Sequence, residues 1–428
     1  MKIGLDVSAV QSAHRMRGIG STTINFLKNL SAEDKKMHEF ILFLHENGRE
    51  EALLALGIEK NDFELRTIKD KRIVKLKLPG RLKIINSIIN IISGYVEEKV
   101  GNNRIKDISD LDVFLQFDQM EPLPRNPKVR MAIILYDLIP YIMESDYLWS
   151  YKTALKNGLS RKSALKKSFL RKRYIGQIRS NTKRADILLA ISKSTKNDFV
   201  SYVGVSAEKI NITHLGVTTL SNEKLSKHIK FQHYIKNSWG LFPHDINLND
   251  KPFLLFIGGA DPRRRLEDLV AAYNNLKAQG YDMRLVMAGD TMRSPDSIPN
   301  AKSRNYIERS SYYNDIVFLG FVSNDQREWL YKNTISLVYP SVYEGFGLPI
   351  LEAMQYGTPV ITYKNSSIME ITGDLAFYAS DAISIKQNVE KIINNPGFRN
   401  EYGSALIDQA SKYSWKNTVS KVLKNLSN

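Results

Sequence analysis

The chain has 428 residues and no cysteine, and its 61 Lys and Arg side chains outnumber its 45 Asp and Glu side chains, giving a net charge of +16 at pH 7. The lack of cysteine excludes disulfides and thiolate metal sites and fits a reducing compartment. The length suits about two to three globular domains, and no stretch approaches the ~20 continuous apolar residues that span a bilayer.

The first strand is predicted at Lys2–Val7, where Asp6 interrupts the apolar run and argues against a signal peptide. We therefore expect a cytoplasmic protein. More short apolar runs with the character of buried strands follow in the first half of the chain: Glu39–Leu44, Asp112–Phe117, Val129–Tyr136, Asp186–Ile191 and Ile210–His214.

A second series of strand-like runs occupies the other half: Pro252–Ile257, Met283–Ala288, Ile316–Leu319, Ile335–Tyr339, Pro359–Thr362 and Ala376–Ala379. Helical segments separate the runs in both series, which predicts two doubly wound α/β domains. We place an N-terminal domain at residues 1–220, a polar linker without a clear strand at 221–250 and a C-terminal domain at 251–412. The last helix, about 413–428, is assigned to the first domain.

A glycine-rich turn follows the first strand. Gly18 and Gly20 precede Ser21 and Thr22, either of which is a suitable N-cap for the next helix. Glycines at such a position often do no more than shape a loop, so the motif alone is weak evidence for a binding site.

The basic residues are concentrated in the first half of the chain. Between Tyr147 and Ala185 there is no acidic residue and there are twelve basic ones. A second basic stretch, 66–83, leads into isoleucines that share one helix face at 84–92. We expect an anionic membrane surface as partner. The alternative is that the isoleucines face the core and the lysines face water. Nucleic acid is not expected, because no nucleic-acid-binding motif is present.

The turn after Phe253–Ile257 carries three consecutive arginines. Asp261 suits an N-cap and Pro262 the first helical position, which would put Arg263, Arg264 and Arg265 in the first helical turn. The helix dipole disfavours cations there, so a bound anion is the simplest compensation. A solvated surface cluster is the alternative.

The segment 341–354 combines two glycines, two glutamates and a proline after a buried strand. Gly345 and Gly347 would let backbone N–H groups approach a ligand, and Pro349 is predicted at the first helical position. Glu344 in the loop and Glu352 in the first helical turn could accept hydrogen bonds from vicinal hydroxyls. Alternatively, Glu352 only complements the helix dipole and Glu344 is solvated.

The string from Glu344 to Glu352, with Gly-Phe-Gly-Leu-Pro between, resembles the signature of retaining glycosyltransferases of family 4. That resemblance implies the GT-B fold, an α/β architecture with two doubly wound Rossmann-like domains facing each other across a cleft. It also implies that Arg263 and Arg264 hold the phosphates of a sugar donor, with Arg264 in place of the usual Lys.

Further matches extend the resemblance. Residues 136–140 match a His-Asp-Leu-x-Pro turn with Tyr136 in place of His, so a donor-sugar contact and simple packing both remain open for this side chain. Gly320 to Val322 resembles the loop whose backbone meets the nucleotide base. Ser21 and Thr22 stand where many members have Arg-Tyr, which leaves the role of the glycine-rich turn open.

The resemblance implies transfer of a hexose, of the mannose or glucose type, from a nucleotide-diphosphate sugar to a hydroxyl of a glycan or lipid-linked saccharide. It implies polysaccharide biosynthesis at the inner face of the plasma membrane, and neither a metal nor a cofactor. The implied catalytic residues are Glu344, Arg263 and Arg264. The implied substrate-binding residues are Gly18, Gly20, Tyr136, Asp137, Gly259, Val322, Gly345, Phe346, Gly347, Leu348 and Glu352.

The main alternative is a non-catalytic GT-B-like subunit that binds a sugar nucleotide or lipid, which the replacements at Ser21, Thr22, Tyr136 and Arg264 favour. Sucrose-type synthesis or phosphorolysis on the same fold is a third possibility. The base and the sugar of the donor are left open.

Overall fold

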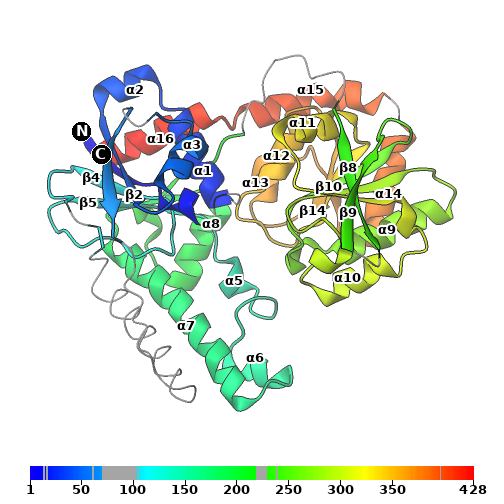
Figure 1. Cartoon of the computed structure of the whole chain (residues 1–428), viewed down its shortest axis with the longest axis horizontal. Helices are drawn as coiled ribbons and strands as arrows, with labels where there is room; N and C mark the ends of the chain where they lie inside the picture. The colour runs from blue at the N-terminus through cyan, green and yellow to red at the C-terminus, as the bar shows by residue number, and fades with distance from the viewer. Residues whose placement is uncertain are drawn as a thin grey trace. The chain divides into compact units, whose positions relative to one another are not determined.

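The computed structural model describes residues 1–12, 15, 18–59, 62–69, 104–105, 107–217, 229–237, 240–395 and 397–428. They form two compact units (Figure 1). The first unit contains residues 1–216 and 415–428, and the second contains residues 217–414. The basic residues 70–83 and the isoleucine-rich segment 84–92 lie outside the described part of the chain, so their predicted roles remain predictions.

The first unit is built on a parallel sheet. Among the described residues its strand order is β3-β2-β1-β4-β5-β6-β7. The bounds are β1 Lys2–Asp6, β2 Glu39–His45, β3 Glu64–Ile68, β4 Val113–Gln116, β5 Arg130–Leu135, β6 Ile187–Ala190 and β7 Ile210–Ile212. The strand order reverses between β1 and β4, as in dinucleotide-binding folds.

Helices accompany this sheet as expected for parallel strands, which need crossover connections. The described helices are α1 Gly18–Lys28, α2 Ala32–Met37, α3 Arg49–Leu56, α5 Ile139–Ile142, α6 Tyr151–Lys156, α7 Arg161–Arg184, α8 Lys193–Asp198 and α16 Trp415–Ser427. Helix α16 packs against α1 and β6 through an apolar face that includes Val419, Val422 and Leu426 (Figure 1).

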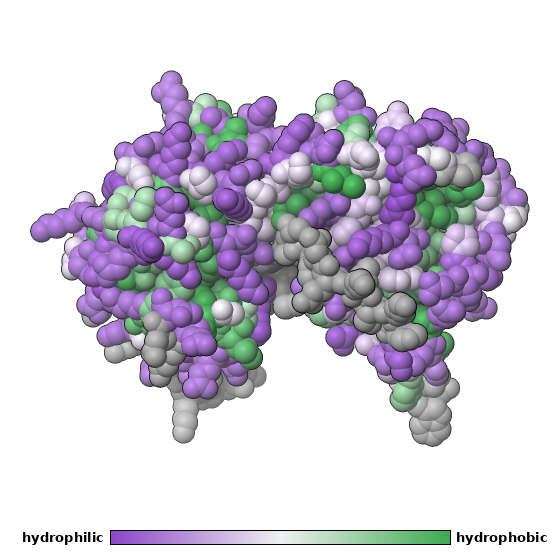
Figure 2. Space-filling model, turned by 90° about the horizontal axis from the view of Figure 1, so that it is seen from above, coloured by the Kyte–Doolittle hydropathy of each residue, from purple (hydrophilic) through white to green (hydrophobic). Residues whose placement is uncertain are grey.

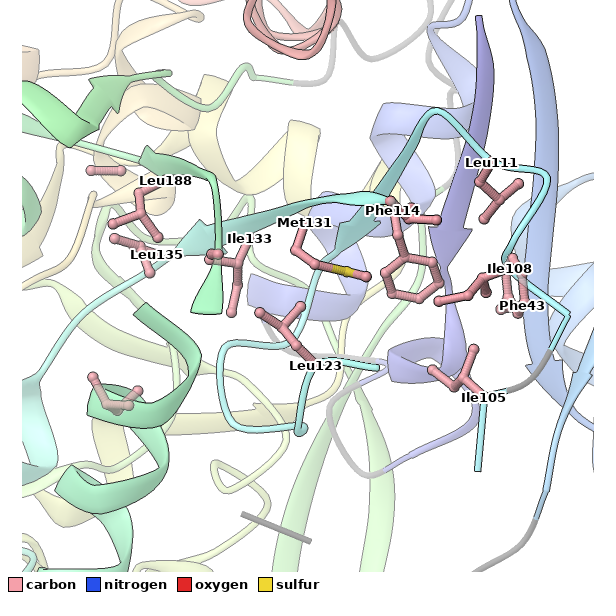
Figure 3. Close-up of a cluster of buried hydrophobic side chains, with 14 of the residues drawn as sticks. Phe43, Ile105, Ile108, Leu111, Phe114, Leu123, Met131, Ile133, Leu135 and Leu188 are labelled. Carbon is pink, nitrogen blue, oxygen red and sulfur yellow. The ribbon is translucent and has the colours of Figure 1, made fainter. Parts of the chain in front are cut away.

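The core of the first unit follows from strand alternation, since every second side chain points to the same face. Met131, Ile133 and Leu135 of β5 lie on one face with Phe114 of β4 and Phe43 of β2 (Figure 3). The rings of Phe43 and Phe114 meet edge to face with centroids 5.3 Å apart. Such aromatic pairs stabilise a core by about 0.5–1.5 kcal/mol beyond the area they bury.

The second unit repeats the same topology. Among its described residues the parallel sheet has the order β12-β11-β10-β13-β14-β15. The bounds are β10 Phe253–Ile257, β11 Arg284–Ala288, β12 Ile316–Gly320, β13 Ser336–Tyr339, β14 Val360–Tyr363 and β15 Phe377–Ala379. The accompanying helices are α9 Leu266–Ala278, α10 Ala301–Glu308, α11 Asn324–Asn333, α12 Leu348–Met354, α13 Ile368–Thr372, α14 Ala382–Ile393 and α15 Phe398–Ser411.

An antiparallel hairpin occupies the region expected to lack strands. Strands β8 (Phe231–Asn237) and β9 (Gly240–Ile246) pair with each other, and β8 packs on β12. The backbone N–H of Phe318 donates to Nδ1 of His233 at 3.0 Å, and the Phe231 ring packs on Trp329 at 5.0 Å. The expectation of a strandless 221–250 was wrong because much of the hairpin is polar and exposed, so it lacks an apolar signal.

The surface is mixed, and hydrophobic side chains appear on it in small patches among hydrophilic ones (Figure 2). Within the described residues, no helix combines the length and the apolar character needed to cross a lipid bilayer.

Close backbone contact joins the carboxyl ends of β10 and β11 in the second unit. Gly289 has φ +139°, and a Cβ added there would lie 2.2 Å from the carbonyl oxygen of Gly258. The N–H of Gly258 donates to the carbonyl of Ala288 at 2.9 Å. Glycine is therefore required here both by the backbone conformation and by the lack of space for a side chain.

We predict that Gly289→Ala destabilises the protein by about 2–4 kcal/mol. The added methyl group forces the close backbone contact with Gly258 apart, and alanine must also adopt a positive φ that is strained for it. The control is Gly280→Ala, where φ is +92° but nothing lies within 4 Å of the added Cβ. It should cost only about 1–2 kcal/mol. Urea unfolding of both variants measures the difference, and equal losses would contradict the steric argument.

Candidate active site

The candidate site lies in the second unit at the switch point of its parallel sheet, which is the place where the strand order reverses. Strands β10 and β13 are neighbours there, and the chain leaves them toward opposite sides of the sheet. The loops that follow them carry Arg263 and Arg264 after β10, and Glu344 after β13. Parallel sheets commonly bind ligands at this position, outside the carboxyl ends of the strands.

The arginine turn differs from the sequence prediction. Pro262–Arg264 form a single 3₁₀ turn, and Arg265 then adopts a left-handed conformation with φ +42° before α9 begins at Leu266. The first turn of α9 carries Glu267 and Asp268, which suit the helix dipole. The argument that a helix dipole demands an anion beside the arginines was therefore wrong. Leu269 and Tyr273 of α9 are buried.

The Glu344 carboxylate is the centre of the site and is only 8% exposed. Its Oε1 accepts hydrogen bonds from the Tyr339 hydroxyl at 3.0 Å and from Ser341 Oγ at 2.9 Å. Arg264 Nε lies 3.4 Å from the same oxygen, and Arg263 Nη2 lies 3.3 Å from Oε2. The alternative of a solvated Glu344 is therefore wrong.

The electrostatics of this carboxylate follow from opposing effects. Burial acts to raise the pKa of Glu344, but the charges of Arg263 and Arg264 and the hydrogen bonds from Ser341 and Tyr339 outweigh it and bring the pKa down to about 2. Glu344 is consequently ionised at neutral pH, and it acts there as a fixed negative charge rather than as a proton donor.

The two arginines are themselves held by the surrounding backbone. Arg264 Nη1 donates to the carbonyl of Gly259 at 2.8 Å, and its guanidinium lies 5.3 Å from the centre of the Tyr339 ring. A Cβ on Gly258 would lie 2.7 Å from Arg264 Nη1, so glycine leaves the space that this guanidinium occupies. Arg263 Nε donates to the carbonyl of Tyr343 at 3.1 Å. Both side chains are thereby fixed before any ligand binds.

The glycine-containing loop after Glu344 is tied to the next loop of the sheet. The N–H of Glu344 donates to Ser366 Oγ at 3.0 Å, and Ser367 Oγ lies 2.9 Å from the carbonyl oxygens of Glu344 and Phe346. Gly347 has φ +104° and precedes α12 directly. Residues 344–347 are all buried, so the loop is rigid by packing and by hydrogen bonds.

Small corrections concern the start of α12. Leu348 is its first residue, so Pro349 takes the second helical position and Glu352 falls in the second turn. Glu352 is not solvated, since it accepts from the Tyr331 hydroxyl at 2.9 Å and lies 3.3 Å from Arg327 Nη1. Its carboxylate therefore has a different set of partners from that of Glu344.

The loop predicted to meet a nucleotide base follows β12. Gly320 has φ +62°, and the next residue, Phe321, is exposed. Val322 is half-buried and precedes α11, whose N-terminus is closed by a capping box between Ser323 and Gln326. The structure thus presents an aromatic ring and a left-handed glycine at the carboxyl end of β12.

The predicted residues of the first unit lie at the carboxyl ends of its own strands. Gly18 and Gly20 are in the first turn of α1, not in a turn before it, and Thr22 donates its hydroxyl to the Gly18 carbonyl at 2.7 Å. The prediction that Ser21 or Thr22 caps α1 was wrong because the helix begins three residues earlier.

Tyr136 and Asp137 follow β5. Tyr136 is 6% exposed, its N–H donates to Gln119 Oε1 at 2.8 Å, and burial raises the pKa of its hydroxyl. This burial favours the packing alternative for Tyr136. Asp137 Oδ1 accepts from the N–H of Ile139 at 3.0 Å and so shapes the turn into α5.

One titratable residue at this edge was not predicted as functional. Asp6 ends β1 and is buried, and burial raises its pKa to about 6, against hydrogen bonds from Ser8 and with added repulsion from Glu121 and Asp118. Asp6 lies beside the reversal of strand order between β1 and β4. Its position as the last residue of a buried apolar strand was the available signal.

Other missed residues belong to the Glu344 cluster itself: Tyr339, Ser341, Ser366, Ser367 and Asp261. Tyr339 and Ser341 could have been predicted from the sequence, because they lie at the end of the strand that leads into the Glu344 motif. The contacts of Asp261 and the 366–367 pair were not, because they depend on which loops become neighbours.

Comparison with known proteins finds a family similarity in the second unit. The family model described as "Glycosyl transferases group 1" matches residues 242–409. This part of the chain is therefore similar to the group 1 glycosyltransferases. A serotype-specific mannosyltransferase, WbdA, of Escherichia coli is 29% identical over 247 residues, covering 55% of this chain and 28% of the relative. An O-antigen chain mannosyltransferase B of Escherichia coli is 31% identical over 175 residues, covering 40% and 44%.

A further relative is also described as a glycosyltransferase. An uncharacterized glycosyltransferase of Methanocaldococcus jannaschii is 28% identical over 249 residues, covering 55% of this chain and 58% of the relative. The chain thus spans between about a quarter and three fifths of the length of these relatives.

Solved structures establish the fold over the full length. The lipopolysaccharide glycosyltransferase WaaG superposes with a TM-score of 0.60 at 13% identity, covering 100% of both chains. The Anabaena protein HepE, solved with UDP and glucose, gives 0.61 at 15% identity, covering 100% of this chain and 99% of that one. The prediction of a GT-B fold with two Rossmann-like domains is confirmed.

The lowered pKa of Glu344 makes stability depend on pH. Its pKa is about 2 in the folded protein and near 4.5 without these contacts, so the stabilisation is present above about 4.5 and is lost as pH falls toward 2. We predict that Glu344→Gln, which lacks the ionisable group, loses less stability between pH 6 and pH 3 than the wild type. Thermal unfolding across this range measures the slope, and identical slopes would contradict the assignment.

Proposed function

We propose that the chain is a retaining glycosyltransferase of family 4 that transfers a hexose from a nucleoside-diphosphate sugar to a hydroxyl of a glycan or lipid-linked saccharide. The single observation that carries the proposal is the fixed pair of guanidinium groups beside the Glu344 carboxylate at the switch point of the second sheet. Fixed positive charges at a switch point suit a ligand with a diphosphate.

The chemistry assigned to the site is electrostatic. When the bond between the sugar carbon and the diphosphate oxygen breaks, negative charge develops on the leaving group, and Arg263 and Arg264 stabilise it. Groups that are already oriented toward such charge are worth several kcal/mol, because they need not reorganise during the reaction. The acceptor hydroxyl forms the new bond on the same face of the sugar and passes its proton to the departing phosphate, so no protein base is required.

Glu344 has two roles in this proposal. It fixes both arginines through its two oxygens, and Oε2, with Arg263 as its one partner among the described contacts, retains a lone pair for a hydroxyl of the transferred sugar. Gly259 and Gly345–Leu348 surround the same position. Val322 and Glu352 are assigned to the base and the ribose of the donor.

The acceptor is assigned to the first unit, where Gly18, Gly20 and Asp137 lie at the carboxyl ends of the strands. The names of two relatives favour mannose as the sugar and surface polysaccharide as the product. A glucose-type sugar with uridine is the alternative donor, since a solved GT-B structure holds UDP and glucose.

A membrane location at the cytoplasmic face is proposed from helix α7. Its first half extends away from the first sheet, with α6 packed against it (Figure 1). Leu165 is 62% exposed and Phe169 is 39% exposed, and their spacing of four residues places them one helical turn apart on the same face of α7. Among the described residues, no acidic side chain forms an ion pair with the basic residues around them: Arg161, Lys162, Lys166, Lys172 and Arg173.

An apolar ridge flanked by cations that have no ion-pair partner among the described residues matches a surface of anionic lipid. The apolar side chains can enter the interface while the lysines and arginines meet phosphate headgroups. Each basic residue close to such a surface contributes about 1 kcal/mol.

The catalytic proposal predicts that Glu344→Ala and Arg264→Ala each lower transfer at least about 100-fold, since each removes a fixed charge from the reacting centre. The measurement is a screen of GDP-mannose, UDP-glucose and related donors, with transfer and donor hydrolysis as readouts. Arg309→Ala, an exposed arginine at the end of α10, is the control that should keep activity. Wild-type activity in both site variants would contradict the assignment of the site. Absence of activity of the wild type with every donor would favour the non-catalytic alternative.

The membrane proposal predicts that Leu165→Ser with Phe169→Ser, and separately Lys162→Glu with Lys166→Glu, lower binding to phosphatidylglycerol vesicles at least about tenfold. Vesicle co-sedimentation measures binding. Leu54→Ser is the matched control, because Leu54 is 81% exposed on α3 of the same unit but has no basic ridge around it. Equal losses in the control, or binding to neutral phosphatidylcholine vesicles alone, would contradict the assignment to α7.

A further inference from the structure

Every nitrogen of the Arg263 guanidinium already faces an acceptor. Nε donates to the carbonyl of Tyr343 at 3.1 Å, Nη2 lies 3.3 Å from Glu344 Oε2, and Nη1 lies 3.0 Å from Asp261 Oδ2. The same Asp261 oxygen lies 3.8 Å from Arg264 Nη1. Each terminal guanidinium nitrogen carries two N–H groups, so a phosphate can still reach these arginines, but on the side where Asp261 lies it competes with that carboxylate.

The charges of this cluster are balanced. Arg263 and Arg264 contribute two positive charges, and Glu344 and Asp261 contribute two negative ones. An incoming diphosphate therefore meets a site whose positive charge is already neutralised, and repulsion by the two carboxylates opposes its binding.

The two carboxylates differ in how easily they can leave. The side chain of Glu344 is 8% exposed, and its oxygens also accept from Tyr339 and Ser341. The Asp261 side chain is 40% exposed, and it makes no capping hydrogen bond to the 3₁₀ turn that follows it. Asp261 can therefore rotate into water at little cost, whereas Glu344 would leave a buried charge unpaired.

We propose that Asp261 is an internal competitor for the diphosphate site, an anionic side chain that occupies the arginines in the free protein and is displaced when a phosphate-bearing ligand binds. This inference rests on the proposed function, because it takes the arginine pair as the diphosphate site. Asp261 keeps the guanidinium groups oriented between turnovers, and its return as the diphosphate leaves favours release of the nucleoside-diphosphate product.

The chemistry of the competitor predicts an effect opposite to that of an ordinary ligand-binding residue. Loss of a binding residue weakens affinity, whereas loss of a competing charge strengthens it. The gain should shrink as salt rises, because the Debye length falls from about 30 Å at 0.01 M to about 3 Å at 1 M and the charge of the exposed carboxylate is increasingly screened.

The test is isothermal titration calorimetry of inorganic pyrophosphate, GDP and UDP with the full chain. We expect Asp261→Asn, which keeps the shape and removes the charge, to bind these ligands about threefold to tenfold more tightly at low salt, in line with an exposed ion pair. Asp408→Asn removes an exposed charge on α15 of the same unit and should leave affinity unchanged. Asp261→Ser serves as a second variant should the amide fold poorly.

The outcomes separate the two proposals. Tighter binding by both Asp261 variants, but not by Asp408→Asn, supports the competitor. Unchanged or weaker binding by the Asp261 variants, with a wild type that does bind, overturns the competitor and leaves the proposed function intact. Absence of binding by the wild type and by all variants overturns the diphosphate site itself, and the competitor with it.

Discussion

The buried Glu344 carboxylate is the group on which the rest of the second-unit site depends. It joins the loop after β10, through Arg263 and Arg264, to the end of β13, through Tyr339 and Ser341. A carboxylate this well buried is tolerated only because Oε1 is paired with Arg264 and two hydroxyls and Oε2 is paired with Arg263. The same contacts orient the guanidinium groups, so one ion cluster serves both stability and ligand binding.

The backbone around this cluster is shaped to make it possible. Gly258 leaves room for the Arg264 guanidinium, and Gly289 allows the ends of β10 and β11 to approach closely. The left-handed conformation of Arg265 separates the arginine turn from α9 and frees the helix N-terminus for Glu267 and Asp268. The arginines are consequently positioned by side-chain contacts rather than by a helix, which leaves an exposed carboxylate able to compete for them.

The two units share one topology and differ in the chemistry at their switch points. The second unit offers fixed cations, whereas the first offers Asp6, whose pKa burial raises to about 6, near Asp118 and Glu121. A shared scaffold with different side chains at the carboxyl ends of the strands is how such folds carry different ligands. Helix α7 adds a surface of basic side chains to the first unit.

The sequence by itself determined the strands of both parallel sheets other than β3, and the position of the Glu344 motif, because strands buried on both faces are continuous apolar runs and the motif has a fixed local spacing. It missed β3, β8 and β9, which are more exposed and carry no such signal. Only the tertiary structure decided that Asp261 and Glu344 share the arginines. That pairing joins residues about 80 positions apart, and it exists only because the parallel sheet places the ends of β10 and β13 side by side.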